Sequence, residues 1–457
     1  MNKKVAVLDV VGLMPELLGE NTPNINRLIK QGFMRPLSGV FPAVTTTAQS
    51  TMITGLSPQQ HGIVGNGWYE RDHAEVMFWK QSNRLVQGKK VWDTLKENNP
   101  NFTCSKLFWW YNMYANVDAS ITPRPHYLAD GRKIIDLYST PTGLHQQIED
   151  KLGKFPFFHF WGPKADIKSS QWIARAAMME FELNQPDLQL VYLPHLDYCL
   201  QKFGPQSEKS IVEVKAIDQL LGELIGFYQQ QNVEIILVSE YGIEEVDTPV
   251  HINKVLRQNN YIQVRETLTW EMLDPGASRA FAVSDHQIAH VYVRDVDDIS
   301  AVKALLENTA GIERVLDKTQ KNDLNIDHER AGDLVAIAEQ GAWFTYYYWL
   351  DDNKAPDFAR TIDIHRKPGY DPTEMFIDPD IKLPMVKIAW RLLQKKLGMR
   401  MLLDVIPLKP ELIKGSHGRL PSSEQKGPLI IAPKRLVREQ INMHEVYELI
   451  LEVFNNE

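Results

Sequence analysis

Buried-strand patterns alternate with amphipathic stretches through the first half of the chain. Continuous apolar runs of strand length occupy residues 5–10, 188–193 and 233–238. Such runs are typical of parallel strands that are covered on both faces. Residues 169–183 and 207–230, next to these runs, carry apolar side chains at helical spacing. The alternation predicts an α/β fold with a mainly parallel sheet flanked by helices.

The pattern changes after about residue 250, where short strand and helix signals of the α+β kind begin. The elements expected are two short strands around a turn at 280–293, a helix at 299–308, a strand pair at 333–338 and 343–349, an apolar run at 428–432 and a closing helix at 443–454. We therefore predict an α/β core formed by residues 1–250 and 411–457, with an inserted α+β cap of residues 251–410.

The composition is that of a soluble globular protein, with 44% hydrophobic and 24% charged residues among 457. The net charge of −8 argues against a nucleic-acid backbone as the main partner. Two cysteines, Cys104 and Cys199, exclude a disulfide scaffold and fit a reducing compartment. Asp9 interrupts the N-terminal apolar run, which we therefore interpret as a strand and not as a signal peptide. Because no apolar stretch is long enough to span a bilayer, we predict a cytoplasmic protein without a membrane partner. Its oligomeric state is left open.

Three of the predicted strands end at an acidic side chain. Asp9 ends the first strand, Asp197 follows the second and Glu240 follows the third. Asp9 alone is equally well explained as the N-cap of the next helix. Ligands of an open α/β sheet gather at the carboxyl ends of its strands, so three such residues in succession predict a metal site on the rim of a parallel sheet.

A further candidate lies in the stretch Phe41–Trp68. Three consecutive hydroxyl residues, Thr45 to Thr47, follow a proline turn and precede a predicted helix that Gly55 ends. A threonine at such a junction lies near free backbone N–H groups, which suit an anion such as phosphate. It becomes a nucleophile only with an adjacent base or metal. An ordinary threonine N-cap on a surface helix is the alternative.

The residues on both sides of Thr45 favour a functional site over an ordinary helix cap. F-P-x-x-T followed by T-G-L-x-P-x-x-H-G-I-V-G-N resembles the nucleophile segment of the nucleotide pyrophosphatase/phosphodiesterase family, within the alkaline phosphatase superfamily. Members carry an aspartate at the end of the first strand, a threonine nucleophile, and then D-x-x-x-H, D-H and H-G motifs. The resemblance can be followed from Val5 to about Pro433. It implies an alkaline-phosphatase-like fold and two divalent metal ions, either zinc or the harder Mn²⁺ or Mg²⁺.

The resemblance also implies an enzyme that hydrolyses a phosphodiester, pyrophosphate or related phosphate or phosphonate ester. Its substrate would be a small phosphate ester or a nucleotide. Thr45 matches the nucleophile and, with Asp9, one set of metal ligands. That set is completed by Glu240 and Tyr241, where the family has Asp-His.

Asp197 and His417 match ligands of the other metal, and Gln201 stands where the family has a histidine four residues after the aspartate. Two imidazoles of the expected set are therefore missing. Three interpretations stay open: harder cations bind to oxygen ligands alone, His365 or His286 fills a vacancy, or the metals are lost and a binding role remains. A phosphotransferase of the same superfamily is a further alternative.

Additional residues are candidates for holding the substrate phosphate. In the family that the chain resembles, an asparagine three residues after the nucleophile helps to hold the phosphate; Ala48 stands there, with Gln49 beside it. The segment DIHRKPGYDP carries His365 and Lys367. Such charge density suits a cap that faces an anionic substrate, although a solvated loop explains it equally well. His286 and His290 are interpreted as polar residues of a surface hairpin.

Overall fold

A computed structural model describes residues 3–129 and 132–455. Its centre is a nine-stranded sheet in the order β23-β2-β22-β11-β1-β10-β5-β6-β9. Five neighbouring strands run parallel: β11 (Glu234–Val238), β1 (Val5–Val10), β10 (Leu188–Leu193), β5 (Cys104–Leu107) and β6 (Ala119–Pro123). On one side follow β22 (Leu429–Pro433), antiparallel to its neighbours, then β2 (Gly32–Ser38) and β23 (Ile441–Asn442); β9 (Leu137–Thr140) is antiparallel to β6 at the other edge. The predicted mainly parallel sheet is confirmed.

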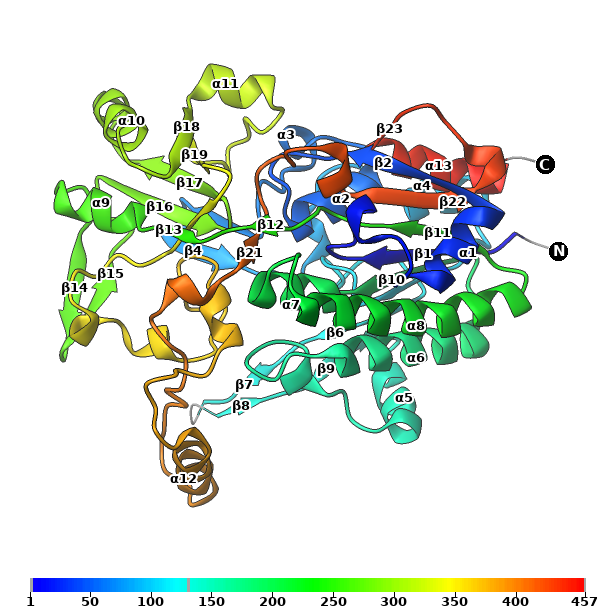
Figure 1. Ribbon diagram of the computed structural model, residues 1–457, viewed down its shortest axis with the longest axis horizontal. Coiled ribbons are helices and arrows are strands. Elements are labelled where there is room, and N and C mark those ends of the chain that lie inside the picture. The colour runs from blue at the N-terminus through cyan, green and yellow to red at the C-terminus, as the bar shows by residue number, and fades with distance from the viewer. Residues whose placement is uncertain (1–2, 130–131, 456–457) are drawn as a thin grey trace.

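Helices cover both faces of this sheet (Figure 1). One face packs against α1 (Pro23–Gln31), α6 (Ile167–Asn184), α7 (His195–Phe203) and α8 (Glu208–Gln230), and the other against α2 (Thr45–Thr54), α4 (Val91–Asn98) and α13 (Glu445–Asn455). Side chains of β1 alternate between the two resulting cores, Leu8 belonging to one and Val7 to the other. Because successive side chains of a strand point to opposite faces, a strand covered on both sides has to be apolar throughout.

A second, four-stranded antiparallel sheet forms within the predicted cap. Its order is β16 (Ala280–Asp285), β17 (Ile288–Val293), β19 (Leu334–Ala338) and β18 (Ile312–Leu316), with α9 (Ile252–Gln258), α10 (Ile299–Glu307) and α11 (Lys318–Asp323) around it. Its core also takes in Ile63, Val64 and Trp68 from the chain after α2. The cap therefore packs directly on the segment that follows the predicted nucleophile. The cap boundaries at 250 and 410 stay a prediction.

The predicted strand at 343–349 is wrong for most of its length. Only β20 (Ala342–Phe344) forms, and it pairs with the equally short β13 (Thr248–Val250). Beyond it, Tyr346, Tyr347 and Trp349 are buried and pack on one another with ring centroids 4.7–5.6 Å apart. Packing of these aromatic side chains, and not a strand ladder, orders that stretch.

Shorter elements complete the chain. They are α3 (Pro58–His61), β3 (Gly67–Glu70), β4 (Glu75–Phe78), β7 (His126–Tyr127), β8 (Lys133–Ile134), α5 (Leu144–Leu152), β12 (Glu244–Glu245), β14 (Val264–Thr267), β15 (Trp270–Leu273), α12 (Pro384–Lys396) and β21 (Gly415–Ser416). Among the residues described, no helix combines the length and apolarity needed to cross a membrane.

Candidate functional site

The site lies at the carboxyl edge of the parallel strands. The register pairs Asp9 of β1 with Tyr192 of β10 and Val238 of β11, so the three strands end at the same level. Asp197 follows β10 in the first turn of α7, and Glu240 follows β11. The predicted convergence of these three carboxylates is therefore what the register of the sheet produces.

Two further segments bring the remaining side chains. Thr45 is the first residue of α2, and its helix N-terminus has no side-chain cap. His417 follows β21, which pairs with β12 shortly after Glu240. A β-bridge between Ala43 and Gly418 holds this segment next to the start of α2. Thr45 and His417 are both buried.

Asp9 and Glu240 form a buried carboxyl pair. The amide nitrogen of Gln49 donates to Asp9 Oδ2 at 3.1 Å and to Glu240 Oε1 at 2.7 Å, while the Gln49 oxygen accepts from the Trp110 N–H at 2.8 Å. Burial raises the pKa of both carboxyls, and the Asp9 charge raises the pKa of Glu240 further. Burial of the two acids side by side therefore favours a protonated form of the pair.

A chain of hydrogen bonds links Thr45 to the third carboxylate. Thr45 Oγ1 lies 2.9 Å from the Tyr241 hydroxyl, which donates to Asp197 Oδ1 at 3.2 Å. Burial raises the pKa of Tyr241 well above 10 and that of Asp197 to about 7. Since Tyr241 donates to Asp197, its oxygen is left to accept the Thr45 proton.

Neutral neighbours hold Asp197 and Tyr241 in place. Gln201 donates to Asp197 Oδ2 at 3.0 Å, and its own oxygen accepts from the Tyr370 hydroxyl at 2.9 Å. The His417 ring stacks on Tyr241 with centroids 3.6 Å apart. His417 Nδ1 donates to the Ala43 carbonyl at 2.8 Å, which leaves Nε2 unprotonated and 3.6 Å from Asp197 Oδ1; burial lowers its pKa well below 6.5.

His286 belongs to this site, and its assignment to a surface hairpin is wrong. It is buried at the tip of the β16–β17 hairpin with φ of 62°. Its ring stacks on Tyr370 and lies tilted by 36° against His417, with both centroid distances 3.7 Å. The neighbouring Asp285 accepts from the backbone and side chain of Asn66. The sequence signal was an Asp-His pair inside an otherwise apolar hairpin. The structure also buries His290, which contacts the Val64 carbonyl.

His365 and Lys367, the two candidates from the cap, have different surroundings in the structure. His365 lines the same cavity as Thr45, with Nδ1 3.3 Å from the Phe78 carbonyl. The prediction that Lys367 faces the substrate is wrong. Its ammonium is buried, 2.7 Å from both Asp371 and Glu374. A buried ammonium needs such partners, so this lysine holds the cap segment together.

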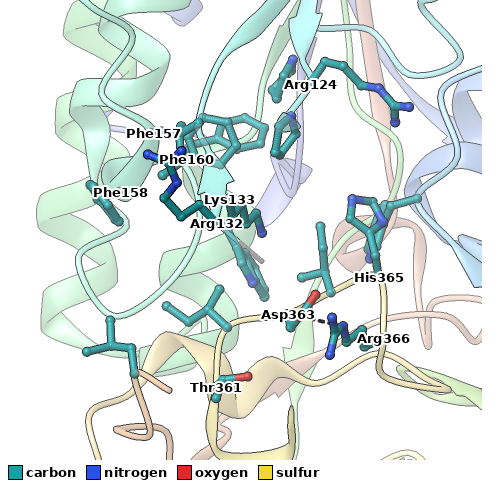
Figure 2. A pocket seen from close by; sticks show the side chains of 18 of the residues that line it. Arg124, Arg132, Lys133, Phe157, Phe158, Phe160, Thr361, Asp363, His365 and Arg366 are labelled. Carbon is teal, nitrogen blue, oxygen red and sulfur yellow. Dashed lines mark ion pairs between the residues drawn. The ribbon is translucent and has the colours of Figure 1, made fainter. Parts of the chain in front are cut away.

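A cavity of about 1120 Å³ opens from the site. Thr45, Asp197, Tyr241, His286 and Tyr370 reach its wall from the buried side. Farther out, Figure 2 shows aromatic and basic side chains around it, and the labelled ones are Arg124, Arg132, Lys133, Phe157, Phe158, Phe160, Thr361, Asp363, His365 and Arg366. A large cavity with an apolar wall and a few convergent polar groups is the usual form of a small-molecule site.

The side chains at the site do not fit a centre of two divalent cations. Within the described residues, no group of three or more His, Cys, Asp or Glu side chains is placed to hold a metal. Gln49 donates into the space between two carboxylates, where a cation would have to bind. At this site, three buried acceptors have no hydrogen-bond partner among the described residues, namely Asp9 Oδ1, Glu240 Oε2 and His417 Nε2. They are too few for two cations, each of which usually takes at least three protein ligands.

Comparison with known proteins agrees with the motif. A model of the family "Type I phosphodiesterase / nucleotide pyrophosphatase" matches residues 5–371. The chain belongs to this family. An uncharacterized pyrophosphatase/phosphodiesterase of Schizosaccharomyces pombe is 24% identical over 265 residues, covering 56% of this chain and 47% of that protein. A venom phosphodiesterase of Macrovipera lebetinus is 22% identical over 234 residues, covering 49% and 23%. The chain thus spans half or less of the length of these relatives.

Solved structures show the fold. Murine ectonucleotide pyrophosphatase/phosphodiesterase 5, in an inactive form bound to AMP, is 15% identical with a TM-score of 0.60 and covers 100% of this chain and 96% of that chain. Phosphonoacetate hydrolase of Sinorhizobium meliloti, bound to phosphonoformate, is 13% identical with a TM-score of 0.62 and covers 99% and 96%. The predicted alkaline-phosphatase-like α/β fold is confirmed.

Restoring the family's imidazoles tests whether the missing ligands explain the poor metal fit. Tyr241 and Gln201 both touch Asp197, so the double variant Tyr241→His/Gln201→His would place imidazoles beside it. We expect elemental analysis after dialysis against zinc to find the metal in this variant and not in the wild type. The surface pair Tyr138→His/Gln147→His is the control. Two zinc ions per wild-type chain would contradict the argument from the donor set.

Proposed function

We propose that this protein hydrolyses a small phosphodiester, pyrophosphate or related phosphate ester, with Thr45 as the nucleophile. The chain of hydrogen bonds from Thr45 through Tyr241 to Asp197 carries the proposal. It places a hydroxyl at a cavity wall and connects it to a base whose pKa is about 7. A general base is most effective when its pKa lies near the working pH.

Proton transfer along this chain would activate Thr45. Thr45 Oγ1 forms a bond to phosphorus while the bond from phosphorus to the leaving oxygen breaks. The Thr45 proton passes to Tyr241, Tyr241 passes its own to Asp197, and Asp197 gives a proton to the leaving oxygen. Water then attacks phosphorus and gives a proton to Asp197 while the bond from phosphorus to Thr45 Oγ1 breaks. Asp197 returns that proton through Tyr241 to the Thr45 oxygen, which restores the starting state. The positive end of the α2 dipole at Thr45 favours the phosphate throughout.

The cavity supports a nucleotide or a similarly large ester as substrate. Trp79 and Trp110 line it with ring centroids 4.8 Å apart, and the cations Arg124, Lys133 and Arg366 lie farther out. Aromatic faces suit a base or another flat or apolar group, and cations suit phosphate. A distant structural relative was solved with AMP bound. We keep the prediction of a cytoplasmic protein, to which the two buried free thiols are suited.

Membership of the family implies dependence on divalent metal ions such as zinc. The side chains at this site give that implication the least support. The proposed steps therefore use only the chain's own residues. The same observation favours a second candidate, in which the site binds a phosphorylated metabolite without hydrolysing it. Gln49 donates to one oxygen of Asp9 and one of Glu240, in the space where a catalytic cation would have to bind. Turnover separates the two candidates.

Thr45 is tested against its neighbour. In Thr45→Ala we expect hydrolysis of bis-p-nitrophenyl phosphate to fall by at least about 10³-fold, because loss of a nucleophile leaves only binding and electrostatics. Thr46 is the matched control, since its hydroxyl donates to the Gly65 carbonyl at 2.8 Å. Thr46→Ala should keep most of the activity. Equal loss in both variants, or activity retained in Thr45→Ala, would remove Thr45 from the mechanism.

Tyr241→Phe tests the proton path. Asp197 has to be ionised to accept a proton, so wild-type kcat should fall as the pH drops below about 7. Without the Tyr241 hydroxyl, kcat should fall by about 10²-fold or more, and this acid limb should disappear. Tyr346→Phe is the control, because it removes another buried hydroxyl that has no hydrogen-bond partner among the described residues. An unchanged pH profile in Tyr241→Phe would exclude the path.

A further inference from the structure

The helix α12 exposes an unusual amount of apolar surface. Nine of the 22 exposed large hydrophobic side chains among the described residues lie between positions 383 and 402. On α12 itself they include Val386 (62% exposed), Trp390 (55%) and Leu393 (45%), and Leu397 (66%) follows directly. These four recur at intervals of four, three and four residues, which places them in one stripe along the helix. No residue of α12 is buried.

The polar side of α12 faces the protein. Lys387 and Arg391 bond to the Asp404 carboxylate at 2.9 and 3.0 Å, and Gln394 accepts from Arg391. The positions 387, 391 and 394 lie on one face of the helix, about 100° from the exposed stripe. A surface helix of a soluble protein normally turns its apolar stripe to the core. The reversed orientation of α12 leaves that stripe free for a partner.

The charge around the stripe is of one sign. Residues 382–400 contain six lysines and arginines and no acidic residue, in a chain whose net charge is −8. Lys387 and Arg391 are engaged with Asp404. The other four, Lys382, Lys395, Lys396 and Arg400, form no ion pair with any residue that the structure describes. A basic helix with a tryptophan in its apolar stripe is the pattern of helices that lie in a membrane interface.

The cavity of the proposed active site runs up to this helix. Leu392, Lys395 and Lys396 of α12 line it, as do Met399 to Leu403 of the following segment. Ile135 and Phe158, which also line the cavity, are exposed as well. Figure 1 shows α12 projecting from the body of the molecule, away from the central sheet. Whatever binds the stripe is therefore next to a route into the site.

We propose that α12 and residues 397–402 dock on the surface of an anionic lipid bilayer, and that the cavity takes its phosphate ester from that bilayer. The apolar stripe enters the boundary between headgroups and acyl chains, while the cations meet the lipid phosphates. The substrate class is then a phosphate ester that carries an apolar chain. The docking stands by itself, and the substrate class rests on the proposed hydrolysis. A search of the sequence for spanning segments misses such an element, because α12 lies on the membrane and does not cross it.

Charge favours a bilayer over a second copy of the chain. In a twofold dimer the same patch lies on both sides of the interface. Residues 382–400 contain no acidic side chain, so Lys395, Lys396 and Arg400 of one copy would meet a patch of the same positive charge on the other. Like charges brought together in an interface are costly. The surface of an anionic bilayer matches both the positive charge of α12 and its exposed apolar stripe.

Co-sedimentation with vesicles tests the docking. We expect the wild type to bind phosphatidylcholine vesicles containing phosphatidylserine at least about tenfold more tightly than phosphatidylcholine alone, and less tightly at high salt. Trp390→Ser/Leu393→Ser should lose at least about tenfold of this affinity. Neither residue lines the cavity. Ile211→Ser/Val212→Ser, which removes exposed apolar side chains from α8, is the matched control and should bind as the wild type does.

Absence of binding, or equal loss in both double variants, would overturn the docking. So would a wild-type dimer in sedimentation velocity that the Trp390→Ser/Leu393→Ser variant dissolves while vesicles bind neither protein, since the stripe would then be a self-association surface. Hydrolysis of soluble bis-p-nitrophenyl phosphate should be the same in wild type and variant, whereas hydrolysis of a long-chain phosphate ester in vesicles should fall in the variant. Vesicle binding without hydrolysis of either ester would leave the docking intact and refute the proposed function.

Discussion

Burial of three carboxyl groups at the edge of one sheet is the constraint on which the site depends. An ionised carboxylate without partners is costly in such a place. In this chain neutral donors supply the partners: the Gln49 amide between Asp9 and Glu240, and the Gln201 amide with the Tyr241 hydroxyl at Asp197. These donors bond to one oxygen of Asp9, one of Glu240 and both of Asp197. Burial still raises the pKa of Asp9 and of Asp197.

The burial of these carboxyl groups also explains the role that we propose for Tyr241. Its hydroxyl is the one group that touches both Thr45 and Asp197, and the stacked ring of His417 fixes its position. His417 is in turn covered by His286, which the cap hairpin delivers with a backbone conformation that L side chains rarely adopt. The cap therefore completes the wall of the site and orders the residues behind it. Since the rings of His286, His417 and Tyr241 contact one another in series, we expect a change in the cap to alter the position of Tyr241.

Sequence reasoning predicted the elements whose signal is local. Asp9, Asp197 and Glu240 follow apolar runs, and the parallel register alone brings such residues together. Thr45 and His417 came from a family motif, and the structure places both beside Tyr241 or Asp197. Their proposed chemical roles are still predictions. What the sequence did not reveal depends on tertiary contacts.

Three cases illustrate that limit. His286 belongs to the cap, and nothing in its hairpin sequence states which part of the core the tip will meet. Lys367 carries a charge that suggested a substrate contact, yet Asp371 and Glu374 are closer partners in the folded chain. On α12 the apolar and basic positions are visible in the sequence, but only the contacts of Lys387 and Arg391 with Asp404 show which side faces outward.

The central claim is that Thr45 attacks phosphorus in a site that needs no divalent cation. The most direct measurement is an acid quench of enzyme dialysed against a strong chelator, a few turnovers after addition of bis-p-nitrophenyl phosphate, followed by mass spectrometry of its peptides. The account predicts a peptide that carries a p-nitrophenyl phosphate group on Thr45, formed at the same rate with and without the chelator. Absence of this adduct, or an adduct that forms only when zinc is returned, would contradict it.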